Sequence, residues 1–597
     1  MRFLTPLFLL LLCTCDRAPS VERLDDAVTG KEDRMVRPNI LFILTDDQGI
    51  GDLSLHGNDS IQTPNMDALL TGSAKINRFY VSPVCAPTRA SFLSGQYAPR
   101  TGAVFVTRRR ETMDDAVMTI PEYLAPLGYR TGLFGKWHNG ATAPYDPGSQ
   151  GFQEFLGFTL GHFNDYFTGE LQNELGERVP FRGDLTDILT DTAAAFMLEQ
   201  SDDPFFAMVT YQAPHTPVQV ANDHWDAVAG RGLTDYNTGI YAMIESIDEQ
   251  IGRLLDGLEQ AGKLDNTVVI FSTDNGPNGD RYRMGLKGTK GQVDEGSVRV
   301  PFGIRFPGDS PYNGRVHDAQ AAHVDLLPTL LDYLGEELPD NLDGRSLMPL
   351  LDDDKSTYYD YNRPVYVFKQ GYEFTGTPGS LRNRNFLYVR RKADEHELYR
   401  LDTDPAQETN IWDSTADWLA EQRAIGREMQ AQYERKVKEV TPDPALIAPP
   451  VDLDAARGPV WLLAHEGEPV GQTHFNDEYG WANDWFVDLG PDGAYWPLET
   501  TTDATYDVLI RYDLNASGAR PLVLGPDKGE VLTVSLPPAR SEKLPVADRT
   551  KRKEVYPRRW AELTVEELTI PAGTTQLRVS SPVGEGLWLK SVRLRRK

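Results

Sequence analysis

Four continuous apolar runs, each followed within a few positions by polar side chains, most strongly constrain the fold of this chain. The runs span residues 39–45, 129–134, 204–210 and 266–273. The polar residues that follow them include Asp46, Asp47, Lys136, His138, His215, Asp274 and Asn275. Such uninterrupted runs are typical of strands buried on both faces of a parallel sheet. Because the carboxyl ends of parallel strands meet along one edge, we expect a site at that edge.

The chain of 597 residues is longer than one hydrophobic core supports, since single cores stop growing near roughly 250–300 residues. The four runs and the amphipathic helices between them predict an α/β domain over residues 37–355. Short strands and one helix predict a small α+β subdomain over residues 356–440. A proline-rich link then leads to residues 451–597, whose short runs and turn residues predict a β-sandwich accessory domain.

The first fifteen residues, MRFLTPLFLLLLCTC, carry an early arginine and an apolar run too short to span a bilayer. This pattern is typical of a secretory signal peptide, and residues 16–36 are interpreted as a tether. The segment ending at Cys15 resembles a bacterial lipoprotein cleavage box, with plain signal cleavage as the alternative. We therefore expect an exported protein, periplasmic or lipid-anchored to the bacterial envelope, that contacts membrane only through an anchor on Cys15.

The net charge limits the partners that the chain can bind. Lys and Arg number 60 against 88 Asp and Glu, which gives a formal charge of −28 at pH 7. This balance argues against nucleic acid, whose binders carry basic faces. An anionic small substrate would require a locally cationic pocket in this acidic protein.

Cys85 is the one cysteine outside the predicted signal segment, so no internal disulfide framework is expected. A lone cysteine is commonly a small buried hydrophobe. Its neighbours argue for more, because Cys85-Ala86-Pro87-Thr88-Arg89 resembles the C-x-P-x-R signature of type I, formylglycine-dependent sulfatases of the alkaline phosphatase superfamily. The resemblance runs from about residue 39 to about residue 436.

Other segments resemble motifs of this family and occur in the family's order. They are Asp46-Asp47, Gly135-Lys136-Trp137-His138, Ala213-Pro214-His215, Asp274-Asn275-Gly276 and Lys290-Gly291 with the segment up to Gly296. Two departures occur in the last of these: Ser297 replaces a usual glycine, and Gln292-Val293-Asp294 replaces a more usual Thr-Thr-aromatic run.

The resemblance implies an α/β fold with an alkaline-phosphatase-like, mostly parallel sheet and helices on both faces. A small α+β C-terminal subdomain and an appended all-β sandwich would follow. It also implies a sulfuric ester hydrolase that removes sulfate from a sulfated carbohydrate, namely an oligosaccharide derived from a polysaccharide. A dedicated maturation enzyme would convert Cys85 to formylglycine, whose hydrate would attack sulfur while a bound Ca²⁺, with Mg²⁺ as the alternative, assists.

Roles for individual residues follow from the same resemblance. The metal ligands would be Asp46, Asp47, Cys85, Asp274 and Asn275. The catalytic residues would be Cys85, Arg89, Lys136, His138, His215 and Lys290. The substrate-binding residues would be His162, Asn164 and Asp165, with Arg108, Arg109 and Arg110 as further sugar contacts. Asp and Asn are individually commoner as turn residues after strands, but their oxygens suit a hard divalent ion better than zinc.

The C-terminal region carries no catalytic motif. Trp481, Trp485 and Trp496 are candidates for exposed, glycan-binding aromatic residues. A basic run between Arg549 and Arg559, with Tyr556 and Trp560 interleaved, would either hold an anionic polysaccharide or pack on the catalytic domain. His323-Val324-Asp325 is interpreted as a structural motif.

Two other functions are compatible with the sequence. A phosphonate or phosphate diester hydrolase of the same superfamily can also use formylglycine. A non-catalytic, sulfated-glycan-binding lipoprotein would not need the full set of metal, lysine and histidine positions. A zinc phosphatase is disfavoured, because the ten histidines are scattered rather than clustered.

Overall fold

Strand β1 (Asn39–Thr45) lies inside a large mixed sheet, and all seven of its residues are buried. It pairs in parallel with β7 (Phe205–Thr210) and with β8 (Thr267–Thr273). The parallel part continues through β3 (Arg130–Lys136) to β4 (Glu154–Phe158), in the order β8-β1-β7-β3-β4. The strands predicted from the four apolar runs are therefore confirmed, and their burial on both faces explains why they are apolar throughout.

Further strands extend both edges of this sheet and make it mixed. On the β8 side β10 pairs antiparallel, and β2 and β11 follow it, while β5 and β6 continue antiparallel beyond β4. The short β9 pairs with β2. These strands are β2 (Ala74–Tyr80), β5 (Thr168–Asn173), β6 (Arg178–Arg182), β9 (Arg299–Val300), β10 (Phe302–Arg305) and β11 (Val316–Ala322).

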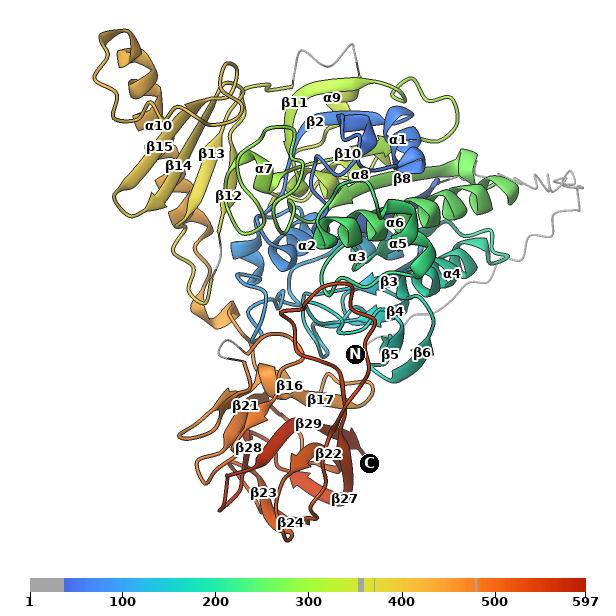
Figure 1. The fold of residues 1–597 in the computed structure, drawn as a ribbon, viewed down its shortest axis with the longest axis vertical. Helices are drawn as coiled ribbons and strands as arrows, with labels where there is room; N and C mark the ends of the chain where they lie inside the picture. Colours follow the sequence, from blue (N-terminus) through green and yellow to red (C-terminus); the bar gives the residue numbers. More distant parts are fainter. Residues whose placement is uncertain (1–36, 353–358, 370, 478–479) are drawn as a thin grey trace, which may run out of the picture. The chain divides into compact units, whose positions relative to one another are not determined.

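Helices cover both faces of the sheet (Figure 1). Alternate residues of β1 point to opposite faces: Phe42 and Leu44 pack with α2 and α8, and Leu41 and Ile43 pack with α1, α4 and α6. The helices are α1 (Pro64–Thr71), α2 (Cys85–Ser94), α3 (Ile120–Leu124), α4 (Leu185–Leu198), α5 (Asn222–Val228), α6 (Asp235–Gln260), α7 (Glu295–Val298), α8 (Leu326–Tyr333) and α9 (Met348–Leu351).

A four-stranded antiparallel sheet and one long helix follow the mixed sheet in the chain. The sheet has the order β12-β13-β14-β15, and α10 (Ala420–Val440) packs on it through Met429 and Tyr433. The Tyr433 hydroxyl donates to the Gly376 carbonyl at 2.6 Å. The strands are β12 (Val365–Phe368), β13 (Gly379–Arg382), β14 (Phe386–Lys392) and β15 (Glu395–Arg400).

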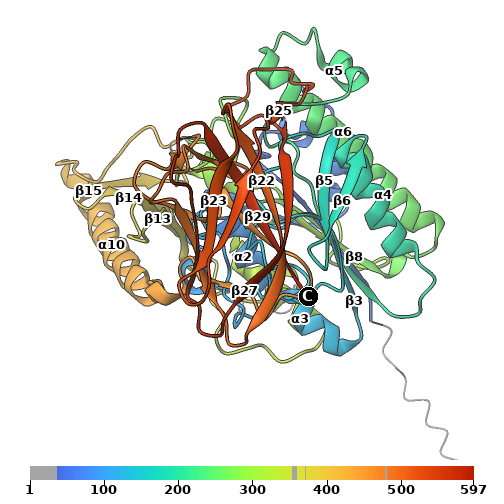
Figure 2. The ribbon, with the colours of Figure 1, turned by 90° about the horizontal axis from the view of Figure 1, so that it is seen from below.

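Beyond residue 450 two further sheets share one apolar core (Figure 2). One contains β16 (Val451–Asp452), β18 (Glu468–Pro469), β21 (Ala494–Glu499), β23 (Arg520–Pro526), β24 (Leu532–Leu536) and β28 (Gln576–Ser580). The other contains β17 (Val460–Leu463), β19 (His474–Phe475), β20 (Phe486–Val487), β22 (Ala504–Leu514), β27 (Ala561–Ile570) and β29 (Leu587–Arg596). The predicted fold class, including its all-β C-terminal region, is confirmed.

The tryptophan predictions in this region are partly wrong. Trp496 has no exposed surface and Trp485 is 5% exposed, whereas Trp481 is 38% exposed. Trp496 points into the core because buried residues alternate along β21, and its indole N–H donates to the Leu463 carbonyl at 2.7 Å. Trp485 and Trp496 therefore stabilise the core and do not offer a glycan surface.

The computed structural model describes residues 37–352, 359–369, 371–477 and 480–597, and residues 38–597 form one compact unit. The predicted signal peptide, tether and anchor residue Cys15 lie outside the described residues. Within the described ranges, no helix combines the length and apolarity needed to cross a membrane. The domain boundaries given above remain predictions.

Candidate active site

Cys85 is the first residue of α2, where the backbone passes from the extended Val84 into the helix. Pro87 lies in the first turn, and the Cys85 side chain is buried. Asn139 supports this helix start, since its Nδ2 donates to the Ala86 carbonyl at 3.0 Å. Burial raises the pKa of the Cys85 thiol, so the unmodified side chain stays protonated and is a weak nucleophile.

Asp46, Asp47, Asp274 and Asn275 lie together because β1 and β8 are parallel and their last residues are direct partners. The Asp47 backbone N–H donates to Asp274 Oδ1 at 3.3 Å, and Asn275 Nδ2 donates to Asp47 Oδ1 at 2.7 Å. All four residues are buried. Asp47 has a φ of 67°, a left-handed conformation that non-glycine residues adopt infrequently and that clusters at functional sites.

Three oxygen atoms of this cluster accept no hydrogen bond from any described residue: Asp46 Oδ1, Asp47 Oδ2 and Asn275 Oδ1. Buried polar atoms normally have partners, so these oxygens call for a ligand. Asp46, Asp274 and Cys85 also each place one ligand-type atom within 4.8 Å of the others. Hard oxygen donors of this kind fit Ca²⁺ or Mg²⁺.

The charges of the carboxylates support the same fit. Burial, followed by the charge of Asp46, raises the pKa of Asp274 to about 7. Burial acts on Asp46 in the same direction, but Lys136 and the neighbouring cations hold the pKa of Asp46 well below its ordinary value. The two buried carboxylates therefore resist carrying two negative charges together, and a divalent cation would remove that resistance.

Arg89 lies one helical turn after Cys85 and binds Asp274 of the carboxylate cluster. Its Nε and Nη2 donate to Asp274 Oδ2 at 3.0 and 2.8 Å, and its Nη1 donates to the Lys136 carbonyl at 2.8 Å. The side chain is 1% exposed. Arg89 thereby fixes the end of β8 against the end of β3, while its catalytic role stays a prediction.

Two lysines bring further positive charge to the end of β1. Lys136 is buried at the end of β3, and its Nζ forms an ion pair with Asp46. Lys290 Nζ lies 2.5 Å from Asp47 Oδ1. Burial lowers the pKa of Lys290, but the negative charges of Asp47 and other groups raise it by more. The pKa therefore lies above its ordinary value, and the ammonium stays charged. With Arg89, three cationic side chains therefore face three carboxylates, and a locally cationic pocket would need the added charge of a bound cation.

His138 is buried just past β3 and has a free ring nitrogen. Its Nε2 donates to the Val106 carbonyl at 3.0 Å, since a carbonyl oxygen can only accept. Its Nδ1 has no partner among the described residues. Burial and the charge of Lys136 hold the pKa of His138 well below its ordinary value. The neutral ring therefore presents Nδ1 as a proton acceptor.

His215 follows β7 and faces the end of β1. Its Nδ1 donates to the Thr216 carbonyl at 2.7 Å, which leaves Nε2 at 3.9 Å from Asp47 Oδ2. Burial and then Lys290 lower the pKa of His215. The ring of His162 stacks on that of His215, with centroids 5.9 Å apart. The imidazole rings of His215 and His162 therefore form a stacked pair, of which His215 faces the carboxylate cluster.

The other predicted substrate contacts differ in how they are used. His162 Nε2 and Asn164 Oδ1 are buried and have no hydrogen-bond partner among the described residues. Asp165 Oδ1, in contrast, accepts from the backbone N–H groups of Phe167 and Thr168 at 2.8 and 3.0 Å. Asp165 therefore holds a turn, while the substrate-binding role of His162 and Asn164 stays a prediction.

The three consecutive arginines contact neighbouring segments in this structure. Arg108 and Arg109 both approach Glu468 of the C-terminal region, the second at 3.5 Å. Arg110 donates to the Tyr372 carbonyl at 3.1 Å. Their predicted contact with a sugar is not supported by these pairings, which engage the side chains elsewhere.

The His323 motif has the structural character predicted for it. Asp325 accepts two hydrogen bonds from Arg363 at 2.8 and 2.9 Å. His323 Nε2 lies 3.0 Å from Ser82 Oγ. Neither residue belongs to the carboxylate cluster, so the motif ties α8 to its surroundings.

The basic run packs on the mixed-sheet region. The Arg549 guanidinium donates to the Val220 carbonyl at 2.9 Å. The Arg552 side chain has no exposed surface and donates to the Asn164 carbonyl at 2.9 Å. For these two residues the packing alternative is confirmed. Glu554 of the same segment contacts Thr216, next to His215; no sequence signal indicated it, because 338 positions separate the two residues.

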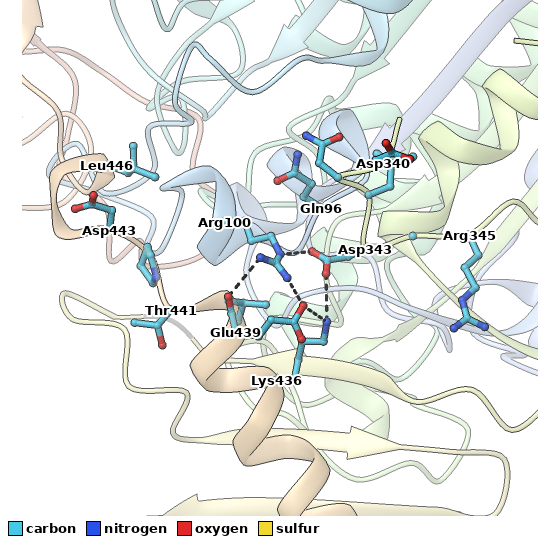
Figure 3. A pocket seen from close by; sticks show the side chains of 15 residues that line it. Gln96, Arg100, Asp340, Asp343, Arg345, Lys436, Glu439, Thr441, Asp443 and Leu446 are labelled. Atoms are coloured by element: carbon cyan, nitrogen blue, oxygen red, sulfur yellow. Dashed lines mark hydrogen bonds and ion pairs between the residues drawn. The ribbon is translucent and has the colours of Figure 1, made fainter. Parts of the chain in front are cut away.

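A separate cavity of about 670 Å³ lies near α10 (Figure 3). Its charged side chains neutralise one another: Arg100 Nε lies 2.9 Å from Asp343, and Lys436 Nζ lies 2.9 Å from Glu439. None of the predicted site residues lines it. The cavity is therefore distinct from the candidate active site.

Comparisons with known proteins match the region that builds this site. The family model described as Sulfatase matches residues 38–336, and the model described as N-sulphoglucosamine sulphohydrolase, C-terminal, matches residues 289–438. Residues 451–597 lie outside both matches.

Several proteins are similar to this chain over most of their own length. An N-acetylglucosamine-6-O-sulfatase of Bacteroides thetaiotaomicron is 25% identical, with 68% of this chain and 88% of the relative covered. An ulvan-active sulfatase of Formosa agariphila is 28% identical, with 72% and 86% covered. The crystal structure of Ps i-CgsB has a TM-score of 0.61 at 25% identity, with 68% and 94% covered.

Proposed function

The chain belongs to the sulfatase family and is a sulfuric ester hydrolase acting on sulfate esters of sugars, and from this premise we propose how it works. Cys85, converted to formylglycine by a maturation enzyme, supplies the nucleophile. A divalent cation, Ca²⁺ or Mg²⁺, is held by oxygen ligands beside it. The substrate is a sulfated carbohydrate derived from a polysaccharide.

The observation that carries this proposal is the position of Cys85. It begins a helix, within 4.8 Å of ligand atoms from Asp46 and Asp274. The partial positive charge of a helix N-terminus favours an anion there. A buried, protonated thiol is a weak nucleophile at this position. The hydrated aldehyde instead offers one hydroxyl that would attack sulfur and a second hydroxyl whose later deprotonation would expel sulfate.

Asp46, Asp47, Asp274 and Asn275 would hold the cation. Their unpartnered buried oxygens and hard donor character support this assignment. When bound, the cation would stabilise negative charge on the attacking oxygen and on the sulfate. Arg89 would keep the ligand geometry fixed, because it already anchors Asp274.

Lys136, Lys290 and His215 would bind the sulfate group. Both lysine ammonium groups face the carboxylate cluster rather than solvent. A cation in the cluster would compete with them for the carboxylates and leave N–H donors for sulfate oxygens. Preorganised donors of this kind stabilise charge that develops in the transition state. His215 Nε2 lies on the same side and would assist the departing sugar oxygen.

His138 would accept the proton from the second hydroxyl of residue 85 when sulfate leaves. Its Nε2 is committed to the Val106 carbonyl, so Nδ1 is the atom available for this transfer. The depressed pKa of the buried ring keeps it neutral and therefore able to accept.

The sugar substrate is supported by the relatives rather than by a bound ligand. One relative is named for N-acetylglucosamine 6-sulfate and another for ulvan. Export of the protein, with Cys15 as a lipid-anchored residue, would place it where a bacterium meets polysaccharide fragments. The maturation enzyme and the anchor belong to this proposal.

The deciding experiment is a sulfate-release screen on defined sulfated oligosaccharides, with free sulfate measured by ion chromatography. We expect release from at least one sugar by the parent protein and none by Cys85→Ala. Parallel assays with an aryl sulfate and an aryl phosphonate separate a sulfatase from a phosphonate hydrolase. Binding of the sugars without release by the matured protein would instead support a glycan-binding lipoprotein.

A further inference from the structure

The loop between β25 (Glu542–Lys543) and β26 (Arg558–Arg559), residues 544–557, leaves the C-terminal sheets and packs beside the active site. The two short strands pair with each other and form the base of this loop. The Arg549 backbone N–H donates to the Val218 carbonyl at 2.8 Å. Its guanidinium also donates to Asn222 Oδ1 at 2.6 Å. The first half of the loop is therefore fixed to the segment that follows β7.

A second anchor lies three residues further along the loop. The buried Arg552 guanidinium pairs with Asp548 at 2.5 Å and donates to the Asn164 carbonyl at 2.9 Å. Asp548 in turn accepts from Gln219 Nε2 at 2.9 Å. Because buried, charge-assisted contacts of this kind are costly to break, the loop holds one position against the substrate-binding segments.

These anchors place Glu554 at the pocket wall. Its carboxylate accepts a hydrogen bond from Thr216 Oγ1, the residue directly after His215. Burial would raise the pKa of Glu554, but the hydrogen bond from Thr216 Oγ1 helps to hold it below the ordinary value. The side chain therefore stays ionised beside the two stacked imidazole rings.

The wall around Glu554 also keeps polar atoms without partners. His162 is 8% exposed, and its Nε2 has no hydrogen-bond partner among the described residues. Asn164 Oδ1 is likewise unpartnered there. Such buried atoms indicate that a polar ligand completes the wall. Glu554 contacts Thr216, the residue after His215, and the ring of His162 stacks on that of His215, so the ligand would be the sugar next to the sulfate.

We propose that the C-terminal β region completes the substrate pocket with Glu554, a specificity-determining residue that accepts a hydrogen bond from a hydroxyl of the sulfated sugar. The inference rests on the proposed function. An ionised carboxylate recognises a hydroxyl donor and repels a second sulfate at the same place. The enzyme should therefore prefer sugars whose hydroxyl at this position is free.

The test compares Glu554→Gln with the parent on two probes, an aryl sulfate without hydroxyls and the best sulfated sugar from the screen. Glutamine keeps the size of the side chain and can still accept from Thr216. We expect kcat/KM on the sugar to fall by about tenfold to a hundredfold, the usual range for a hydrogen bond to a charged group. We expect kcat/KM on the aryl sulfate to stay within about twofold. The ratio of rates on disulfated and monosulfated sugar should rise.

Two controls separate recognition from a structural role. Glu542→Gln removes an exposed carboxylate, paired with Arg559 at 2.8 Å on the same β region, and should leave both rates unchanged. Thr216→Val removes the hydrogen bond but keeps the carboxylate, so it should retain the discrimination against disulfated sugar. Equal losses by Glu554→Gln on both probes, or no loss on either, would overturn the inference. Absence of sulfate release from every sugar by the parent would instead refute the proposed function.

Discussion

Replacing Arg89 by methionine tests the claim that this residue holds the carboxylate cluster together. Methionine keeps much of the side-chain volume but removes every donor. The change takes away two hydrogen bonds to Asp274 Oδ2 and one to the Lys136 carbonyl, all at 2.8 to 3.0 Å and all buried. Asp274 is then left as a buried carboxylate without its bidentate partner.

The expected cost is large because one partner of a buried ion pair is removed. Such a change typically destabilises a protein by about 3–5 kcal/mol, which for a compact unit as large as residues 38–597 corresponds to a fall of roughly 3–4 °C in the melting temperature. The assay is thermal unfolding with chelator at pH 8, above the pKa of about 7 that burial and Asp46 give Asp274. Arg89→Lys should lose less stability than Arg89→Met, because lysine keeps the positive charge. It should still be less stable than the parent, because lysine lacks the planar, forked donors of arginine.

A double-mutant cycle tests the reasoning further. Asp274→Asn combined with Arg89→Met removes both charges, so the double variant should be more stable than the sum of the single losses predicts, by about 1–3 kcal/mol. A melting temperature for Arg89→Met within about 2 °C of the parent, or strictly additive losses, would refute the account of a buried pair.

Three further results are expected. Chelation should abolish sulfate release, and Ca²⁺ should restore it, because all proposed protein ligands are hard oxygens; better restoration by zinc would contradict this. His323 is buried with a pKa of about 3, so the unfolded chain binds one more proton as the pH falls from about 6.5 toward 3, and stability is lost in that window. His323→Gln should reduce by about 2 kcal/mol the stability lost between pH 8 and pH 5 in urea titrations, and an unchanged loss would refute the assignment. A chain ending at Ala448 should lose sulfate release from sugars, because it lacks the Arg549 and Arg552 contacts and Glu554; full retention would contradict the role of the β region.

The parallel strands and their polar ends could be predicted because local sequence determines them. A run such as Asn39–Thr45 is apolar at every position only when both faces are buried, and the carboxyl ends of neighbouring parallel strands must meet. The same reasoning predicts from the sequence alone that Asp46 and Asp274 lie close together. Pro87, two residues after Cys85, is also a local signal, because proline fits the first turn of a helix.

Other features depend on contacts between distant segments and have no local signal. Glu554 reaches Thr216 because two arginines of its loop donate hydrogen bonds to backbone carbonyls that are more than 300 residues earlier in the chain. Trp496 looked like an exposed aromatic residue, but the register of β21 turns it into the core. The sequence of a short strand does not determine which face of the sheet a tryptophan side chain occupies. A basic run likewise does not indicate which hydrogen-bond acceptors its side chains will contact.

The most direct test of the central claim is the rate of sulfate release by Cys85→Ala, measured beside the parent on the same sulfated sugar. Residue 85 is proposed to provide both the nucleophile and a metal ligand, so the variant should stay folded and lose activity. We expect its rate to fall below roughly a hundredth of the parent rate, a barrier increase of more than about 2.7 kcal/mol. A folded variant that retains more than this rate would contradict the proposed mechanism.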